Sequence, residues 1–221
     1  MTEAEWLACD EPEAMYVFAT EEGELTRKSR LLGCTCARRL WHLLNGVYQS
    51  AIEVAERYED GLALRHEIEA AHREGEVATY RDYADDTAID LARIVVQSVT
   101  SPDHPFANLD KAAGAFAWDA GNEEVGWDDA IKCEVAVQVR LVRDIFGNPF
   151  RPITFAPAWR TDTALSLARQ MYDSRDFGAM PILADALQDA GSDNPDIHTH
   201  CRGDGPHVRG CWVVDLILGK E

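Results

Sequence analysis

Apolar residues recur at intervals of three and four along almost the whole 221-residue chain, and Gly, Pro and Asn interrupt the pattern. This spacing places apolar side chains on one face of an α-helix. One Val-rich stretch, 135–142, has the propensity of a strand. We interpret it as helix because the chain offers it no partner strand. The pattern therefore predicts an all-α fold, with about ten helices in a compact multi-helix bundle and an arrangement in two closely packed lobes as a variant.

The expected helices are bounded by capping and helix-stop signals. Thr2 and Glu5 form a capping box, and Asn45-Gly46 ends a longer helix. Residues 74–81 are predicted to be a flexible connection. The helices are expected at residues 2–9, 11–20, 26–44, 48–59, 64–73, 82–99, 106–118, 127–146, 162–173, 180–190, 194–201 and 206–218.

The clearest interruption follows residue 146. Gly147, Pro149 and Pro152 stand within six residues of one another, and two prolines in so short a segment are incompatible with continuous helix. We therefore divide the chain into an N-terminal helical region, 1–146, a connector, 147–152, and a C-terminal helical region, 153–221.

The charge of the chain is strongly acidic and unevenly distributed. Lys and Arg number 21 and Asp and Glu 39, which gives a formal net charge of −18. Such a charge repels phosphate backbones, so we expect no nucleic-acid partner. Residues 1–24 contain no base, and residues 25–52 contain no acid. Either the two segments pack together and neutralise each other, or the basic helix from Arg27 to Arg39 contacts an acidic protein partner.

Nothing in the sequence suggests a membrane or an export route. No apolar run approaches the roughly 20 residues that a membrane-spanning helix needs. The first residues are acidic and lack the features of a secretion signal. The six cysteines do not have the spacing of a disulfide framework. We therefore expect a soluble cytoplasmic protein with reduced thiols and no membrane partner.

The C-terminal part of the chain holds the densest group of potential metal ligands. His198 and Cys201 are three residues apart, and His207 and Cys211 are four apart, spacings that place side chains on one face of a helix. Thiolates and imidazoles in such an array suit tetrahedral zinc. Alternatively, the cysteines are small buried residues and the histidines are surface or capping groups. The candidate metal ligands are His198, His200, Cys201, His207 and Cys211.

Three weaker patterns also carry potential chemistry. Cys34 and Cys36 lie on different faces of a helix, so they share an ion only if the helix opens at Gly33. Cys211 can be imagined as a nucleophile beside His207 and Asp215, but stacking along one buried helix leaves little room for a substrate. Glu69 and His72 have the spacing of a di-iron ligand pair, without the second pair that such a site needs. We assign no catalytic residue.

Three stretches of the chain look like parts of one family. They are MTEAEWLACDEP at 1–12, RLLGCTCARRLWHLL at 30–44, and the C-terminal sequence that includes DIFGNPFRP and ends in HCRGDGPHVRGCWVVDLILGKE. Together they resemble a paralogous family of uncharacterised bacterial proteins whose members share these ends and vary in the middle, about 62–130 here. Relatives often have a third Cys near the position of Ala37. The resemblance implies a shared fold and supplies no reaction.

Two hypotheses of function follow. The first is a noncatalytic protein-interaction module, supported by the lack of a convincing catalytic array and by the many short helices. The second is a zinc-binding regulatory protein or a small metal-dependent enzyme that uses the C-terminal His/Cys cluster. Zinc is the one cofactor that the second hypothesis admits, and the first needs none. Convergence of the sulfur and nitrogen atoms to within about 5 Å distinguishes the two.

Overall fold

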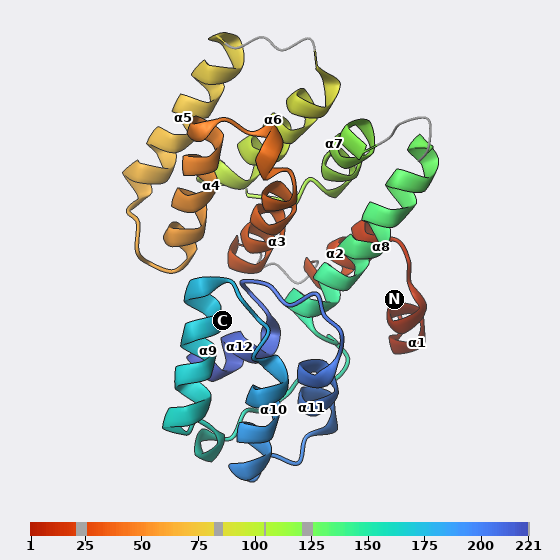
Figure 1. Cartoon of the computed structure of the whole chain (residues 1–221), viewed down its shortest axis with the longest axis vertical. Coiled ribbons are helices and arrows are strands. Elements are labelled where there is room, and N and C mark those ends of the chain that lie inside the picture. Colours follow the sequence, from red (N-terminus) through yellow and green to blue (C-terminus); the bar gives the residue numbers. More distant parts are fainter. Residues whose placement is uncertain (21–25, 82–85, 104, 121–125, 221) are drawn as a thin grey trace. The chain divides into compact units, whose positions relative to one another are not determined.

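The computed structural model describes residues 1–20, 26–81, 86–103, 105–120 and 126–220. Within these ranges the chain forms twelve α-helices and two short 3-10 helices, and it contains no strand (Figure 1). The predicted all-α, multi-helix fold is confirmed. None of the helices in these ranges has the length and apolar character needed to cross a membrane.

The chain divides into two units that do not follow its sequence order. The first, which we call the N-terminal unit, is Leu7–Val139. The second, the C-terminal unit, combines Met1–Trp6 with Arg140–Glu221. The helix α8 (Trp127–Phe146) begins in the N-terminal unit and ends in the C-terminal unit.

The N-terminal unit is built around one helix that contacts most of the others. This is α6, which packs against α3, α4, α5 and α7. Its buried face includes Ala92, Val95 and Val99, all at helical spacing. The helices of this unit are α2 (Pro12–Thr20), α3 (Thr26–Arg39), α4 (Gly46–Glu59), α5 (Arg65–Arg81), α6 (Thr87–Thr100) and α7 (Leu109–Ala120), with the 3-10 helix η1 (Trp41–Leu43).

Helix α3 is continuous through Gly33, so the opening that would let Cys34 and Cys36 share an ion does not occur. The glycine serves close packing instead. A Cβ atom at Gly33 would lie 2.3 Å from Cγ1 of Val99 on α6. Both cysteines are buried, and burial raises the pKa of the Cys36 thiol to about 12. We conclude that they are core residues.

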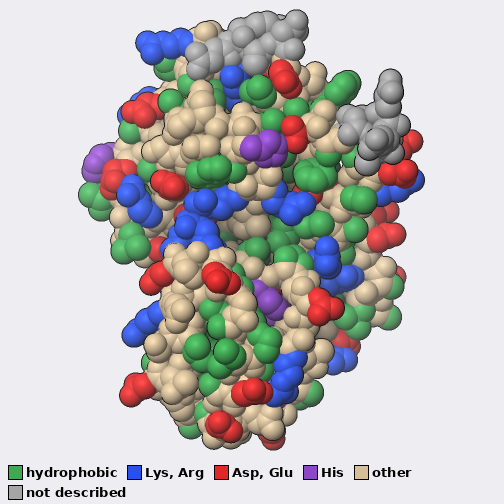
Figure 2. All heavy atoms as spheres, in the orientation of Figure 1, with side chains coloured by type: hydrophobic (Ala, Val, Ile, Leu, Met, Phe, Trp, Pro, Cys, Tyr) green, Lys and Arg blue, Asp and Glu red, His purple; other side chains and the backbone are tan. Residues whose placement is uncertain are grey.

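Three arginines of α3 pair with acidic residues of the same unit. Arg30 pairs with Glu59. Arg38 pairs with Glu56 at 2.6 Å, and Arg39 pairs with Glu134 at 2.6 Å. The partners therefore belong to α4 and α8, and the interpretation that residues 1–24 neutralise this helix is wrong for these three arginines. Figure 2 shows acidic and basic side chains interspersed on the face in view.

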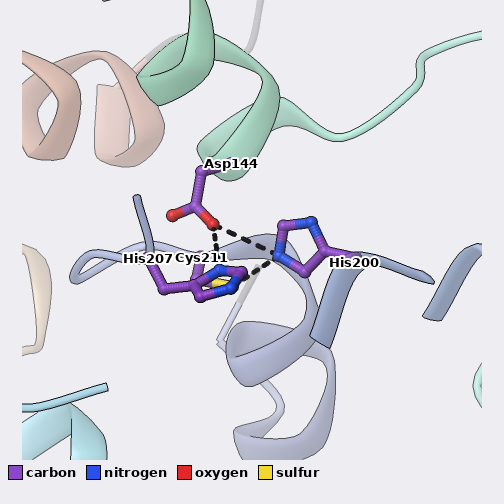
Figure 3. Close-up of side chains that lie close together, drawn as sticks. All are labelled: Asp144, His200, His207 and Cys211. Atoms are coloured by element: carbon purple, nitrogen blue, oxygen red, sulfur yellow. Dashed lines mark hydrogen bonds and ion pairs between the residues drawn. The ribbon is translucent and has the colours of Figure 1, made fainter. Parts of the chain in front are cut away.

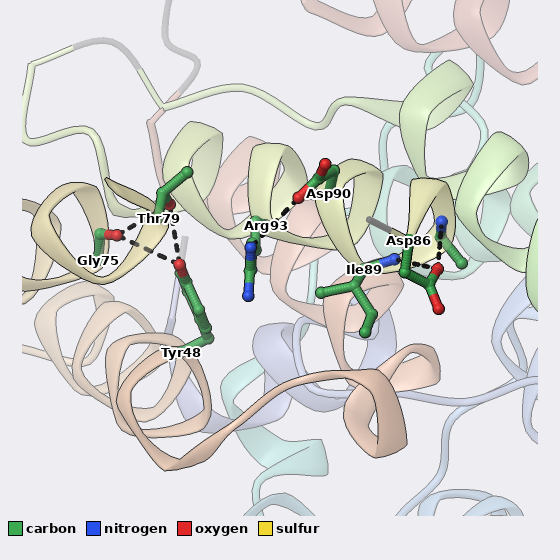
Figure 4. A network of polar contacts seen from close by, with 8 residues as sticks. Tyr48, Gly75, Thr79, Asp86, Ile89, Asp90 and Arg93 are labelled. Atoms are coloured by element: carbon green, nitrogen blue, oxygen red, sulfur yellow. Dashed lines mark hydrogen bonds and ion pairs between the residues drawn. The ribbon is translucent and has the colours of Figure 1, made fainter. Parts of the chain in front are cut away.

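The segment 74–81, predicted to be a flexible connection, is the second half of α5. Its packing explains the difference (Figure 4). The hydroxyl groups of Tyr48 and Thr79 lie 2.8 Å apart, and the Thr79 hydroxyl donates to the Gly75 carbonyl at 3.0 Å. Gly75 lies so close to α6 that a Cβ there would meet Nε2 of Gln97 at 2.5 Å. Tertiary contacts therefore continue the helix where the sequence pattern is weak.

The C-terminal unit has its own apolar core. Met171, Leu183, Ile197 and Val213, from four different helices, are at most 1% exposed. These helices are α9 (Asp162–Ser174), α10 (Met180–Asp189), α11 (Pro195–Arg202) and α12 (Trp212–Leu218). The unit also contains the 3-10 helix η2 (Pro157–Trp159) and the end of α8. The first residues of α1 (Glu3–Ala8) also belong to this unit. The carbonyl of Trp6 accepts a hydrogen bond from Nη2 of Arg143 at 3.1 Å.

The last helix begins later than predicted. The pattern predicted one helix over 206–218, whereas α12 starts at Trp212 with Cys211 as its N-cap. Gly205 has φ 70° and Gly210 has φ 94°, conformations that break a right-handed helix and that glycine tolerates. His207 therefore lies in a loop and Cys211 at a helix start. They are not stacked on one helix.

Candidate metal centre

Four side chains converge in the C-terminal unit, each from a different backbone context (Figure 3). Asp144 comes from the last turn of α8, His200 from α11, His207 from the following loop and Cys211 from the N-cap of α12. One ligand atom from each residue lies within 4.8 Å of the others. No other group of three or more His, Cys, Asp or Glu converges in this way within the described ranges.

Asp144 is the buried acid at the centre of the group, with a side chain 2% exposed. Its Oδ1 lies 2.9 Å from Nδ1 of His207 and 3.2 Å from Nε2 of His200. Its Oδ2 accepts the backbone N–H of Val208 at 3.0 Å. Burial would raise the pKa of this carboxyl, but the hydrogen bonds from His200 and His207 hold it below its ordinary value. Asp144 is therefore an ionised carboxylate.

His200 lies between Asp144, Cys211 and an indole ring. Its Nε2 is 3.1 Å from Sγ of Cys211. Its Nδ1 accepts a hydrogen bond from Nε1 of Trp212 at 3.1 Å. Because an indole nitrogen only donates, the proton of a neutral His200 sits on Nε2, where it faces the carboxylate.

His207 has one nitrogen in use and one without a partner. Nδ1 faces Asp144, whereas Nε2 is buried and makes no hydrogen bond within the described part of the chain. The side chain is 8% exposed. A buried polar atom without a partner is costly and marks a place where a ligand or ion can supply the missing contact.

Cys211 is fully buried. Burial, with a smaller contribution from the charge of Asp144, raises the pKa of its thiol well above the ordinary value. In the metal-free protein the group is therefore a neutral thiol. This disfavours a cysteine nucleophile, which needs a lowered pKa. Asp215, the third member of that hypothesis, is not part of the converging group.

Two of the predicted ligands lie elsewhere. Nε2 of His198 makes a 2.9 Å hydrogen bond with the carbonyl of Ser192. Cys201 belongs to the apolar core with Ile197, four residues earlier on α11, and burial raises its pKa to about 12. The spacing of three between His198 and Cys201 thus does not bring either residue to the group of four converging side chains. His200, His207 and Cys211 are the predicted ligands that the structure brings together.

Sequence reasoning missed Asp144. One signal was present in the sequence, because an acidic residue in the last turn of a helix is opposed by the helix dipole. Asp144 also stands between the buried Val142 and Ile145. An acid in such a position needs a specific partner.

Each of the two units contains a pocket. One, of about 200 Å³, lies beside the four side chains and is lined by residues of the C-terminal unit. The other, of about 620 Å³, lies in the N-terminal unit between α5 and the start of α4, where Val47 and Val77 are partly exposed.

The comparisons with known proteins add no family. No family model, no curated protein and no solved structure matches the chain.

Proposed function

We propose that the C-terminal unit binds one Zn²⁺ ion through Asp144, His200, His207 and Cys211. The observation that carries this proposal is the convergence of four ligand atoms within 4.8 Å of one another. Zinc accepts sulfur, nitrogen and carboxylate oxygen in one tetrahedral shell, whereas Mg²⁺ and Ca²⁺ prefer oxygen alone. A set of one thiol, two imidazoles and one carboxylate therefore favours zinc.

The proposed ion has a structural or regulatory role. Four protein ligands fill a tetrahedral shell, and catalytic zinc sites keep one position open for water or substrate. The ion would connect the end of α8 to the segment 200–211, more than fifty residues later in the chain. Because only folding brings points so distant in sequence together, the binding energy of the ion stabilises the folded state.

Binding of the ion requires one proton to leave and another to move. The Cys211 thiol, whose pKa is raised, must lose its proton to become a ligand. The proton on Nε2 of a neutral His200 moves to Nδ1, a change of tautomer that releases no proton to solvent. Zinc uptake therefore releases the Cys211 proton, and zinc affinity rises with pH.

Native mass spectrometry of protein purified under reducing conditions without chelator tests the proposal. We expect one zinc per chain, lost in Cys211→Ser and in His207→Gln. Cys133→Ser is the matched control, because Cys133 is exposed and outside the group. A wild-type chain that takes up no zinc when titrated with it, or equal loss in the control, contradicts the proposal.

Replacement of zinc by Co²⁺ gives a second readout. A cobalt–thiolate bond produces a charge-transfer absorption band, so the band should be present in Cys133→Ser and absent in Cys211→Ser. Circular dichroism of each variant establishes that it is folded. A band that persists in Cys211→Ser would mean that another cysteine binds the metal.

The interaction-module hypothesis stays a prediction. The feature that bears on it is the pocket of about 620 Å³ beside Val47 and Val77. Sedimentation velocity of Val77→Asp against wild type tests self-association through this face, with a loss of dimer expected if the hypothesis holds. The two functions are compatible, because the pocket and the metal group lie in different units.

A further inference from the structure

The pocket beside the metal group is small and carries two arginines. Its volume is about 200 Å³, below the roughly 300–1,000 Å³ of sites for drug-sized ligands. Its lining includes Arg140, Arg143 and Thr199, the segment Gly203–Pro206, and the metal-group residues Asp144, His200 and His207. A pocket of this size suits a small ion or a single functional group.

Arg140 is a positively charged residue of the pocket lining. It is exposed and makes no ion pair or hydrogen bond within the described ranges. Arg143 lies three residues later and therefore on the same face of α8. Its Nη2 donates to the Trp6 carbonyl, which holds the side chain in place. Two neighbouring guanidinium groups at one pocket are notable in a chain of net charge −18.

His207 supplies a third, buried polar group. Its side chain is 8% exposed, and its Nε2 has no hydrogen-bond partner among the described residues. His207 is among the residues that line the pocket, and Nδ1 of its ring faces Asp144.

We propose that this pocket binds a small tetrahedral oxyanion, phosphate or the phosphate group of a small monoester, beside the bound zinc. The inference rests on the proposed zinc site. Arginine forks match the oxygen geometry of phosphate. Zinc bound to one thiolate and one carboxylate is formally neutral, so it offsets the charge of Asp144 and leaves the arginines dominant.

Asp204 is an acidic residue of the pocket lining, and its negative charge repels an anion. It is exposed to solvent, so water screens its charge. In the metal-free protein the charge of the Asp144 carboxylate, which also lines the pocket, is added to that of Asp204. Oxyanion binding is therefore coupled to zinc binding, with the zinc-loaded protein as the competent form.

Isothermal titration of zinc-loaded protein with inorganic phosphate, free of excess zinc, tests the inference. We expect saturable binding that weakens about tenfold or more in Arg140→Ala and is partly retained in Arg140→Lys. Arg169→Ala is the matched control, since Arg169 is an exposed arginine on α9 of the same unit. Metal-free protein should bind phosphate more weakly than zinc-loaded protein. Titration with phenyl phosphate distinguishes a monoester site from a free-phosphate site.

The outcomes separate the two proposals. Zinc-loaded protein that does not bind either phosphate overturns the subsite and leaves the zinc site standing. An equal loss in Arg169→Ala and Arg140→Ala also overturns it, because it would mean binding to diffuse positive charge. A chain that takes up no zinc overturns the metal centre and the subsite together, and mass spectrometry before the titration identifies that case.

Discussion

A carboxylate as buried as Asp144 needs positive charge or several donors to remain ionised. The fold supplies two imidazoles and the N–H of Val208. These groups satisfy the carboxylate without metal, and they also surround a place where an ion would have four ligands. The same geometry thus suits a metal-free state and the proposed metal-bound state.

Substitution of Asp144 by Asn should affect both states. The amide removes the charge, so we expect zinc affinity to fall at least about tenfold, the loss typical of a single ligand contact or its support. The amide also replaces the acceptor Oδ2 with a donor, opposite the N–H of Val208. This should destabilise the metal-free protein by about 1–3 kcal/mol.

Urea unfolding with and without zinc measures both effects. Asp204→Asn is the control, since Asp204 is exposed and outside the four-residue group. A zinc affinity that is unchanged in Asp144→Asn would remove this residue from the ligand set.

Trp212 determines which ring nitrogen of a neutral His200 carries the proton. Its indole N–H holds Nδ1 of His200 as an acceptor, which favours the tautomer with the proton on Nε2 and so opposes ligation through that atom. Trp212→Phe removes this opposition, which is worth about 1 kcal/mol for one hydrogen bond. We expect Trp212→Phe to bind zinc as tightly as wild type or up to about fivefold more tightly.

Tryptophan fluorescence gives the matching signal. Zinc should change the emission of the wild type, because the Trp212 and His200 rings have centroids 5.0 Å apart, and this change should disappear in Trp212→Phe. Zinc binding that is tenfold weaker in the variant would show instead that Trp212 supports the site.

The site illustrates what residue spacing can and cannot predict. His200, His207 and Cys211 are close in sequence, so a local pattern was enough to nominate them. Asp144 lies on a helix that the sequence assigns to another region, and only tertiary packing brings it near. His198 and Cys201 share the local pattern, but the face of α11 that carries Cys201 is needed for the core.

At the scale of the elements, α3 packs closely on α6 at Gly33. Alanine in a helix interior is normally about 1 kcal/mol better than glycine. At Gly33, however, a Cβ would lie 2.3 Å from the fully buried Val99 side chain and 3.4 Å from the backbone of Ala107. Overpacking of this kind costs about 1–3 kcal/mol.

We therefore expect Gly33→Ala to destabilise the protein by about 1–2 kcal/mol, the overpacking cost less the gain in helix propensity. Gly46→Ala is the matched control, because a Cβ at Gly46 meets no atom within 4 Å, and it should be neutral or slightly stabilising. Thermal unfolding of both variants decides between helix propensity and packing. A stabilised Gly33→Ala would mean that α3 and α6 separate at little cost.

Some element boundaries follow the local sequence signals and others do not. The helix predicted over 26–44 ends at Arg39, and Asn45 is the N-cap of α4 rather than a helix stop. The helix predicted over 127–146 is α8, Trp127–Phe146, since Gly147 with φ 68° ends it. Two further errors have opposite causes. At 74–81 the contacts with Tyr48 and Gln97 stabilise helix beyond the local pattern, and at 206–211 the backbone of Gly210 excludes helix despite an apolar spacing that favours it.

At the scale of the whole molecule, the four proposed ligands all lie in the C-terminal unit, and none lies in Leu7–Val139. A ligand that binds only the folded state stabilises it in proportion to the logarithm of its concentration. The core of the C-terminal unit is formed by apolar residues of α9 to α12, so we expect this unit to be folded without zinc and more stable with it.

Hydrogen exchange with and without zinc tests this expectation along the chain. At a free zinc concentration of about 100 times the Kd, stabilisation is about 2.7 kcal/mol, which slows exchange through opening of the site by about a hundredfold. The slowing should cover the last turn of α8, α11, residues 203–211 and α12. The helices α4, α5 and α6 should exchange at the same rate with and without the ion. Cys211→Ser with zinc should match the metal-free wild type throughout. Equal slowing in both units would contradict a local clamp, because it would mean that the ion stabilises the chain as one cooperative structure.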